Sequence, residues 1–146
     1  MRNKLELDRS QSGITILEVV IILLVLGIVV AVTYPQFKTI IYQSREGRTK
    51  SNLGDLRGAL AIYYSDNFGL FPSDEGTPET RLSSTLTPHY LKEIPCVELP
   101  HLYPKKLNTV QDRFTGQGDW VYTTLHGFVA VNSYKLDTRG DYISKW

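Results

Sequence analysis

The stretch that decides the fold spans residues 13–35 and reads GITILEVVIILLVLGIVVAVTYP. Its 21 residues from 14 to 34 contain one charged side chain, Glu18. A helix of this length rises about 32 Å, which matches the roughly 30 Å hydrocarbon core of a bilayer. β-branched residues weaken a helix in water, but in lipid the backbone must bond to itself, so we expect a helix. A carboxylate in such a helix costs several kcal/mol unless a partner holds it.

Three interpretations of this run compete. A secretory signal peptide has a shorter apolar core and a small-x-small cleavage site, and the best candidate site, residues 31–33, stands just before Pro35. A plain signal anchor would let Glu18 snorkel to water. The third interpretation is a membrane segment from which the preceding residues are removed by processing just before Ile14. Loop charge does not fix the orientation of the run; taken alone, the excess of Lys and Arg after it slightly favours a cytoplasmic position for the larger part of the chain.

The rest of the chain has the size and charge of one modest domain. Residues 51–146 carry nine Lys or Arg against eleven Asp or Glu, and the whole chain of 146 residues has a net charge of +1. This balance argues against a dedicated nucleic-acid-binding protein. The single cysteine, Cys96, excludes an intrachain disulfide and is better explained as a buried thiol than as a catalytic or metal-binding one.

Periodicity predicts an α+β fold. The first helix is expected to continue to about Asn67, because apolar residues recur three and four apart at Leu53, Leu56, Leu60, Tyr63 and Tyr64. For the aromatic residues near the end of this helix, packing in the core is favoured over stacking along a polymer; these residues are Tyr63, Tyr64, Phe68 and Phe71. A proline-rich region with a short helix around 84–90 follows, and residues 119–124 and 128–132 flank a hairpin turn. The expected fold is a long N-terminal helix with a small antiparallel sheet on its second half.

A family resemblance rests on these residues. A polar leader ending in Gly13, the hydrophobic Ile14, Glu18 four residues later and the long apolar run resemble the prepilin signal of type IV pilins and type II secretion pseudopilins. Residues 45–72 are similar to the second half of the pilin helix and its Asn-x-Gly-x-(Tyr/Phe)-Pro exit, and YLKEIP at residues 90–95 is similar to a segment common in the group. The chain departs from the pattern in having Ile14 for the usual Phe or Met, a weakly basic leader, no Asp-Pro-Trp-Gly motif and no cysteine pair.

The resemblance implies a fold, a function and partners. It implies a pilin-like fold with a leader (1–13), a transmembrane assembly helix (14–35), the rest of the helix (36–71) and a loop-rich β-sheet region (72–146). It implies a non-enzymatic subunit of a homo-oligomeric helical pilus or pseudopilus filament, with no cofactor. Its partners would be a prepilin peptidase and an inner-membrane assembly platform with a separate ATPase. The head would lie in the periplasm of a bacterium. The alternative is a minor pilin-like, membrane-anchored adhesin or binding module.

The resemblance also gives roles to single residues. The peptidase would cut between Gly13 and Ile14, and the new amino terminus would be methylated. Glu18, on the same helical face four residues later, would pair with the amine of a neighbouring subunit and so set the register of assembly. Gly27 and Pro35 would permit a bend or local melting in a filament, and a simple kink at Pro35 is the alternative.

Catalytic and metal-binding patterns are missing from the sequence. No nucleophile, base and acid set is evident, and His89, His101 and His126 lack the spacing of metal ligands. Asp137 and Asp141 suggest a calcium loop, but Arg139 between them opposes a cation, so a solvated turn is favoured. No Gly-rich phosphate loop is present, and an anchored enzyme has no residues to support it.

Overall fold

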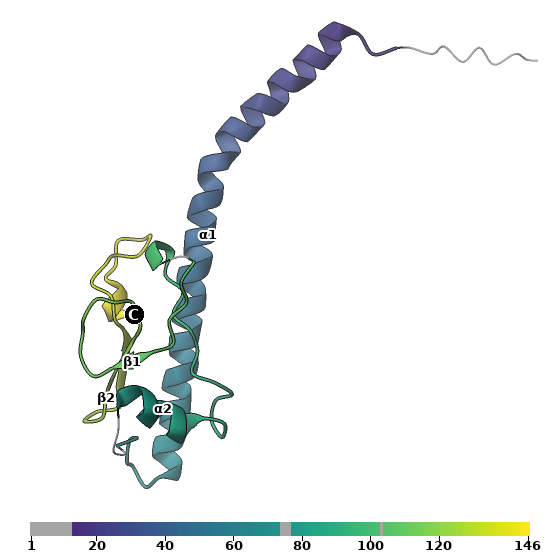
Figure 1. The fold of residues 1–146 in the computed structure, drawn as a ribbon. Coiled ribbons are helices and arrows are strands. Elements are labelled where there is room, and N and C mark those ends of the chain that lie inside the picture. Colours follow the sequence, from purple (N-terminus) through teal and green to yellow (C-terminus); the bar gives the residue numbers. More distant parts are fainter. Residues whose placement is uncertain (1–12, 74–76, 103) are drawn as a thin grey trace, which may run out of the picture. The chain divides into compact units, whose positions relative to one another are not determined.

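A computed structural model of the chain describes residues 13–73, 77–102 and 104–146, so the predicted leader lies outside the described residues apart from Gly13. The elements are α1 (Ile16–Asp66), α2 (Pro78–Leu86), the 3-10 helix η1 (Pro100–Leu102), β1 (Val110–Gln111), β2 (Trp120–Thr123), β3 (Phe128–Val131) and the 3-10 helix η2 (Ile143–Lys145). The chain divides into two compact units between Phe37 and Lys38. The second unit, which we call the head, contains the later part of α1 and every other element (Figure 1).

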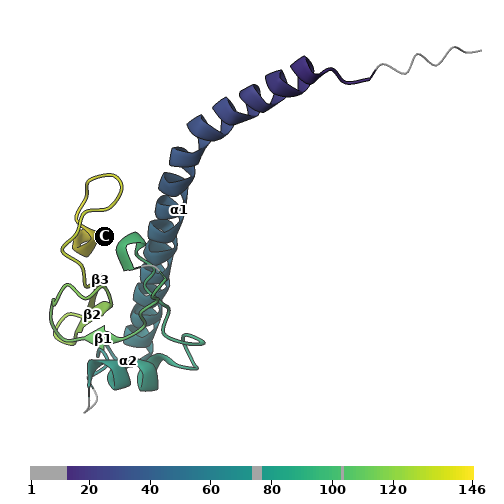
Figure 2. The ribbon, with the colours of Figure 1, turned by 45° about the horizontal axis from the view of Figure 1, so that its top comes forward.

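The head is built on one face of α1. Leu53, Leu56 and Leu60 are buried at three- and four-residue spacing, as the sequence predicted, and the sheet lies beside this part of α1 in both views (Figures 1 and 2). Trp120 of β2 is fully buried, and its indole N–H donates to the carbonyl of Pro95 at 2.6 Å. The described core consists of Leu53, Leu56, Ala59, Leu60, Leu82, Leu86, Ile94, Val97, Leu99, Val110, Trp120, Tyr122, Val129, Val131 and Ile143.

The sheet has three strands in the order β1-β2-β3. β2 and β3 form the predicted antiparallel hairpin, with Trp120 opposite Val131. β1 runs parallel to β2, so the sheet is mixed rather than wholly antiparallel. The connection back to β2 is held by Asn132, whose Oδ1 accepts the N–H groups of Thr115 and Gly116 at 2.7 and 2.8 Å. The expected α+β fold, a long N-terminal helix with a small sheet against its second half, is confirmed.

Two local predictions differ from the structure. The helix expected around residues 84–90 is α2, Pro78–Leu86, because proline suits the first position of a helix, and residues 87–90 form a turn. Core packing was also wrong for Phe68, which is 99% exposed. α1 has already ended at Asp66, and Phe68 has a φ of 54°, so it no longer follows the helical stripe. Tyr63 does pack against the core.

Candidate functional site

The described part of the first unit, residues 13–37, is almost wholly apolar, with Glu18 as its one charged side chain. α1 contains one stretch long and apolar enough to cross a membrane, and none of that stretch is buried by the chain. The large apolar side chains from Ile14 to Phe37 are 44% to 86% exposed. A helix that is hydrophobic all round is covered by lipid or by other protein. This part of α1 is therefore suited to burial in lipid or against other protein.

Glu18 lies in the first turn of α1. Its backbone N–H donates to Thr15 Oγ1 at 3.2 Å, so Thr15 caps the helix and Glu18 stands at the third helical position. The positive end of the helix dipole favours a carboxylate there by about 0.3–1 kcal/mol. Among the residues that the structure describes, none forms a hydrogen bond or ion pair with the Glu18 carboxylate. The dipole offsets only part of the several kcal/mol that a charge costs in lipid.

Gly27 and Pro35 lie inside α1, which is continuous through both positions. Pro35 has no N–H to donate to the preceding turn. Close to it, the Thr33 hydroxyl donates to the carbonyl of Val29 at 2.6 Å, a bond that Thr commonly makes in membrane helices. An added Cβ at Gly27 would meet no atom within 4 Å. A bend or melting at these residues stays a prediction about the filament.

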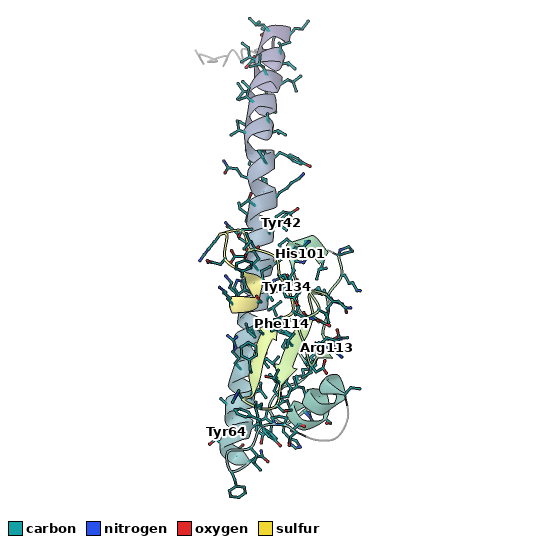
Figure 3. All side chains as sticks on the ribbon, turned by 90° about the vertical axis from the view of Figure 1, so that its left-hand side faces the viewer. Tyr42, Tyr64, His101, Arg113, Phe114 and Tyr134 are labelled. Carbon is teal, nitrogen blue, oxygen red and sulfur yellow. The ribbon has the colours of Figure 1, made fainter. Side chains whose placement is uncertain are left out.

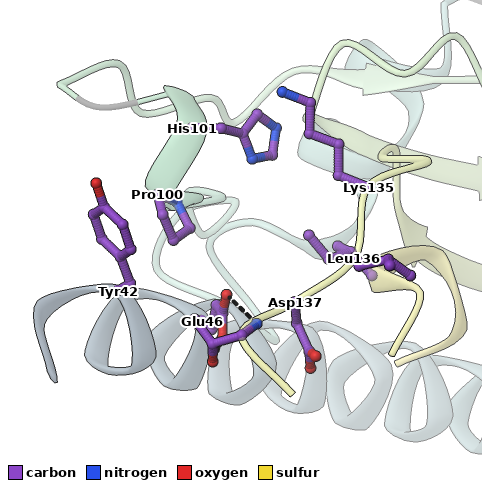
Figure 4. Close-up of a pocket in the computed structure, with 9 residues that line it drawn as sticks. Tyr42, Glu46, Pro100, His101, Lys135, Leu136 and Asp137 are labelled. Carbon is purple, nitrogen blue, oxygen red and sulfur yellow. Dashed lines mark hydrogen bonds between the residues drawn. The ribbon is translucent and has the colours of Figure 1, made fainter. Parts of the chain in front are cut away.

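Within the head, Glu46 ties α1 to the loop that follows β3. Glu46 is 6% exposed, and its carboxylate accepts the backbone N–H and the hydroxyl of Thr138 at 3.0 and 2.6 Å (Figure 4). Two charge-assisted hydrogen bonds satisfy a carboxylate that would otherwise be costly to bury. The bonds hold this loop against α1, although Glu46 and Thr138 are 92 residues apart in the sequence.

Asp137, the neighbour of Thr138, organises the same loop. Its Oδ1 accepts the N–H groups of Arg139 and Asp141 at 2.9 and 3.0 Å, and its Oδ2 accepts Lys50 Nζ at 3.1 Å and the indole N–H of Trp146 at 3.2 Å. Burial raises the pKa of this carboxyl, but the hydrogen bonds from Asp141, Lys50 and Arg139 and the charge of Lys50 outweigh it and lower the pKa from 3.8 to about 2. Lys50 Nζ also lies 4.3 Å from the Trp146 ring centroid.

Residues 138–141 are exposed, as expected for a solvated turn, but Asp137 at the start of the turn is buried. The Asp137 side chain is fully buried and carries its own counter-charge, Lys50 on α1. The described residues include no group of three or more His, Cys, Asp or Glu side chains that could hold a metal ion. Lys50 Nζ, 3.1 Å from Asp137 Oδ2, supplies the positive charge beside this carboxylate.

A second tie joins α1 to the segment before η1. Thr49 is fully buried, and its Oγ1 accepts the backbone N–H of Glu98 at 2.9 Å. The Glu98 carboxylate accepts a 2.7 Å contact from Lys106 and lies 3.7 Å from Arg48. The hydrogen bond from Lys106 lowers the pKa of Glu98, and the charge of Arg48 adds to this. The head is thus held to α1 at Glu46, Thr49 and Lys50 as well as by its apolar core.

One end of the head carries a pocket of about 290 Å³, lined by Tyr42, Glu46, Pro100, His101, Lys135, Leu136, Asp137, Thr138 and Ile143 (Figure 4). We call it the collar pocket. Burial lowers the pKa of His101, and the charge of Lys135 lowers it further, so His101 is neutral at pH 7. No ion pair of the Lys135 ammonium occurs in the described part of the chain.

The structure places the predicted site residues within α1 or just before it, and it shows others that were not predicted. Gly13 and Ile14 are exposed just before α1, and Glu18, Gly27 and Pro35 lie within it. Among the described residues, no side-chain hydrogen bond or ion pair joins any two of these five positions. Sequence reasoning missed the cluster of Glu46, Lys50 and Asp137. Its signal was available, because Glu46 and Thr49 continue the buried stripe of Leu53 and Leu56 backwards at the same spacing.

Two curated relatives share sequence with the chain. Fimbrial protein EcpC of Eikenella corrodens is 26% identical over 88 residues, which cover 60% of this chain and 56% of that protein. Type II secretion system core protein G of Pseudomonas aeruginosa is 28% identical over 95 residues, covering 60% of this chain and 67% of that protein. The chain is thus similar in sequence to one fimbrial protein and one type II secretion system core protein.

The two matches cover only part of each relative. The match to the fimbrial protein spans little more than half of that protein's length. No family model matches the chain, and no solved structure matches it significantly. Neither relative's name denotes an enzyme.

Proposed function

We propose that this chain is a structural subunit of a type IV pilus or type II secretion pseudopilus filament. The observation that carries the proposal is the fully exposed apolar helix with Glu18 in its first turn, attached to a separately folded head. A simple membrane anchor needs the apolar surface but has no use for a carboxylate at that depth. The names of the two relatives, a fimbrial protein and a secretion system core protein, support the same role.

The proposed assembly follows from charge. A peptidase cuts between Gly13 and Ile14, and the freed amine lies at the start of the helix. The amine of one subunit pairs with the Glu18 carboxylate of its neighbour, since each charge is costly in lipid alone and both are neutralised together. The chain waits in the inner membrane with residues 14–35 across the bilayer and its head in the periplasm. A separate platform and ATPase supply the work of extrusion.

A membrane-anchored adhesin or binding module is the competing role, and abundance separates the two. A structural subunit dominates the filaments sheared from cells, whereas a tip adhesin forms a small fraction of them. The slightly acidic balance of residues 51–146 disfavours nucleic acid as a ligand. Pilus and pseudopilus are separated by whether filaments appear on the cell surface without overexpression.

The charge of Glu18 provides the direct test. Glu18→Gln keeps the shape and removes the charge, and Glu18→Asp is the matched control that keeps it. We expect both variants to reach the membrane and to be cleaved, and only Glu18→Gln to lose filaments, by about tenfold or more. Normal filaments from Glu18→Gln would show that charge pairing does not guide assembly.

A further inference from the structure

The end of α1 carries an unusual residue. Gly69 N–H donates to the carbonyl of Tyr64 at 2.9 Å, which is the wide bond of a Schellman cap and places Phe68 at the left-handed position that glycine usually occupies. Phe68 has a φ of 54°, and Gly69 follows at 81°. A bulky side chain is disfavoured in this conformation. The ring is 99% exposed, so within the described chain no burial compensates for it.

Phe68 has an apolar neighbour in Leu70, which is 67% exposed. We call Phe68 and Leu70 the distal knob. A strained backbone that presents an apolar side chain to solvent is an outlier that points to a role outside the isolated molecule. Single exposed apolar residues are common, but two together at the cap of the main helix form a projecting contact surface.

The collar pocket lies at the other end of the head. Figure 3 shows Tyr42 and His101, which line it, at the end of the head opposite Tyr64, which lies four residues before Phe68. Its volume of about 290 Å³ exceeds the roughly 150 Å³ that suffices for benzene in an apolar cavity. Pro100 and Leu136 supply apolar walls, and the Lys135 ammonium lies at the pocket as a cation for the face of an aromatic ring.

We propose that the distal knob of one copy inserts into the collar pocket of another copy of this chain. This contact rests on the proposed function, because it gives the heads of a filament their own interface besides the one between apolar helices. It joins two different surfaces, so it is heterologous and continues from copy to copy without closing. A second apolar groove, lined by Tyr64, Phe71 and Phe128, lies beside the knob itself, and pairing of these like ends would stop at a dimer.

The geometry sets a spacing. Tyr42 and Asp66 lie on the same helix, 24 residues apart. At a rise of 1.5 Å per residue they are separated by about 36 Å along α1. Two copies joined by knob and pocket are therefore offset by about that distance along the helix direction.

Disulfide crosslinking tests the contact in the full chain, expressed in the cell that assembles it. The variant carries Cys96→Ser, Leu70→Cys and Leu136→Cys, so the Phe68 ring is kept and every chain holds a cysteine on both sides of the interface. Under mild oxidation we expect a ladder of multimers in the sheared filament fraction. Variants with only one of the two new cysteines are the controls, and they should stop at dimers.

A second variant measures what the knob contributes. Phe68→Gly places the residue that the cap favours, so we expect the head to unfold at the same or a higher temperature. The variant lacks the ring that the proposed contact would bury, so the amount of recovered filament should fall by about tenfold or more. Leu125→Ala removes another exposed apolar side chain, at the β2–β3 turn, and should leave filament yield unchanged.

Each outcome decides between the two proposals. Filaments that give a ladder support the contact. Filaments without a ladder, or full filament yield from Phe68→Gly, overturn the contact and leave the proposed function standing. A ladder from membranes without any filament keeps the contact and refutes the proposed function. A wild-type chain that forms no filament, together with a cysteine variant that gives no ladder, refutes both.

Discussion

Asp137 is the residue on which the arrangement of the late loop depends most. Asp137→Asn would remove the charge that accepts four hydrogen bonds and would turn one acceptor oxygen into a donor. Bonds to a charged group contribute about 1.5–3 kcal/mol, and a buried donor left without a partner costs about 1–3 kcal/mol. The Lys50 side chain is 39% exposed and recovers part of its loss in water. We expect the free energy of unfolding to fall by about 2–4 kcal/mol.

Thermal unfolding of the full chain in detergent measures this loss through tryptophan fluorescence. Trp120 is buried in the core and Trp146 contacts Asp137 directly, so both report on the head. A loss of this size lowers the melting temperature by about 10 °C or more in a domain near 100 residues. Asp141→Asn is the control, because Asp141 binds Asp137 through its backbone N–H and its side chain is exposed. An Asp137→Asn variant with the same melting temperature as the wild type would refute this account of the loop.

The same carboxyl gives the head a pH dependence. Its pKa is lowered from 3.8 to about 2 in the folded state, so the stabilisation is fully present above pH 4. It is lost as the pH falls from about 4 to 2, because the unfolded chain binds the proton first. Asp137→Asn should remove this part of the slope between pH 4 and 2. An identical slope in variant and wild type would show that other groups cause the acid sensitivity.

Three further predictions concern the head. Leu56→Ala should lower the free energy of unfolding by about 2–5 kcal/mol in chemical denaturation, because Leu56 is fully buried, and a loss under 1 kcal/mol would contradict the packing. Glu46→Gln should cost about 1–3 kcal/mol and speed hydrogen exchange at the Thr138 amide, and unchanged exchange would exclude the tie to the loop. Chelation of divalent cations should leave the melting temperature unchanged, because Lys50 already neutralises Asp137, and a clear fall on chelation would reveal a metal.

Patterns that depend on periodicity were readable from the sequence. The apolar run, the Leu53, Leu56 and Leu60 stripe and the β2–β3 hairpin each repeat with the period of their element, so local residues determine them. The parallel pairing of β1 was not readable in this way. β1 has only two residues. Its position depends on Asn132, which directly follows β3 and accepts hydrogen bonds from Thr115 and Gly116 in the loop between β1 and β2.

The polar ties of α1 were missed for a different reason. Glu46 and Thr49 stand at core positions of the stripe, and a polar residue at such a position must find a partner. The sequence shows this demand but does not show that Thr138 and Glu98 meet it, because those residues are 92 and 49 positions away. Phe68 was misjudged because an aromatic residue next to the core was assumed to join it.

The central claim is that α1 begins a processed subunit whose new amino terminus pairs with Glu18 of a neighbour. N-terminal sequencing of the protein recovered from sheared filaments tests it most directly. The account predicts a chain that begins at Ile14 with a methylated amine. A chain that begins at Met1, or one cut after Thr33, would contradict it.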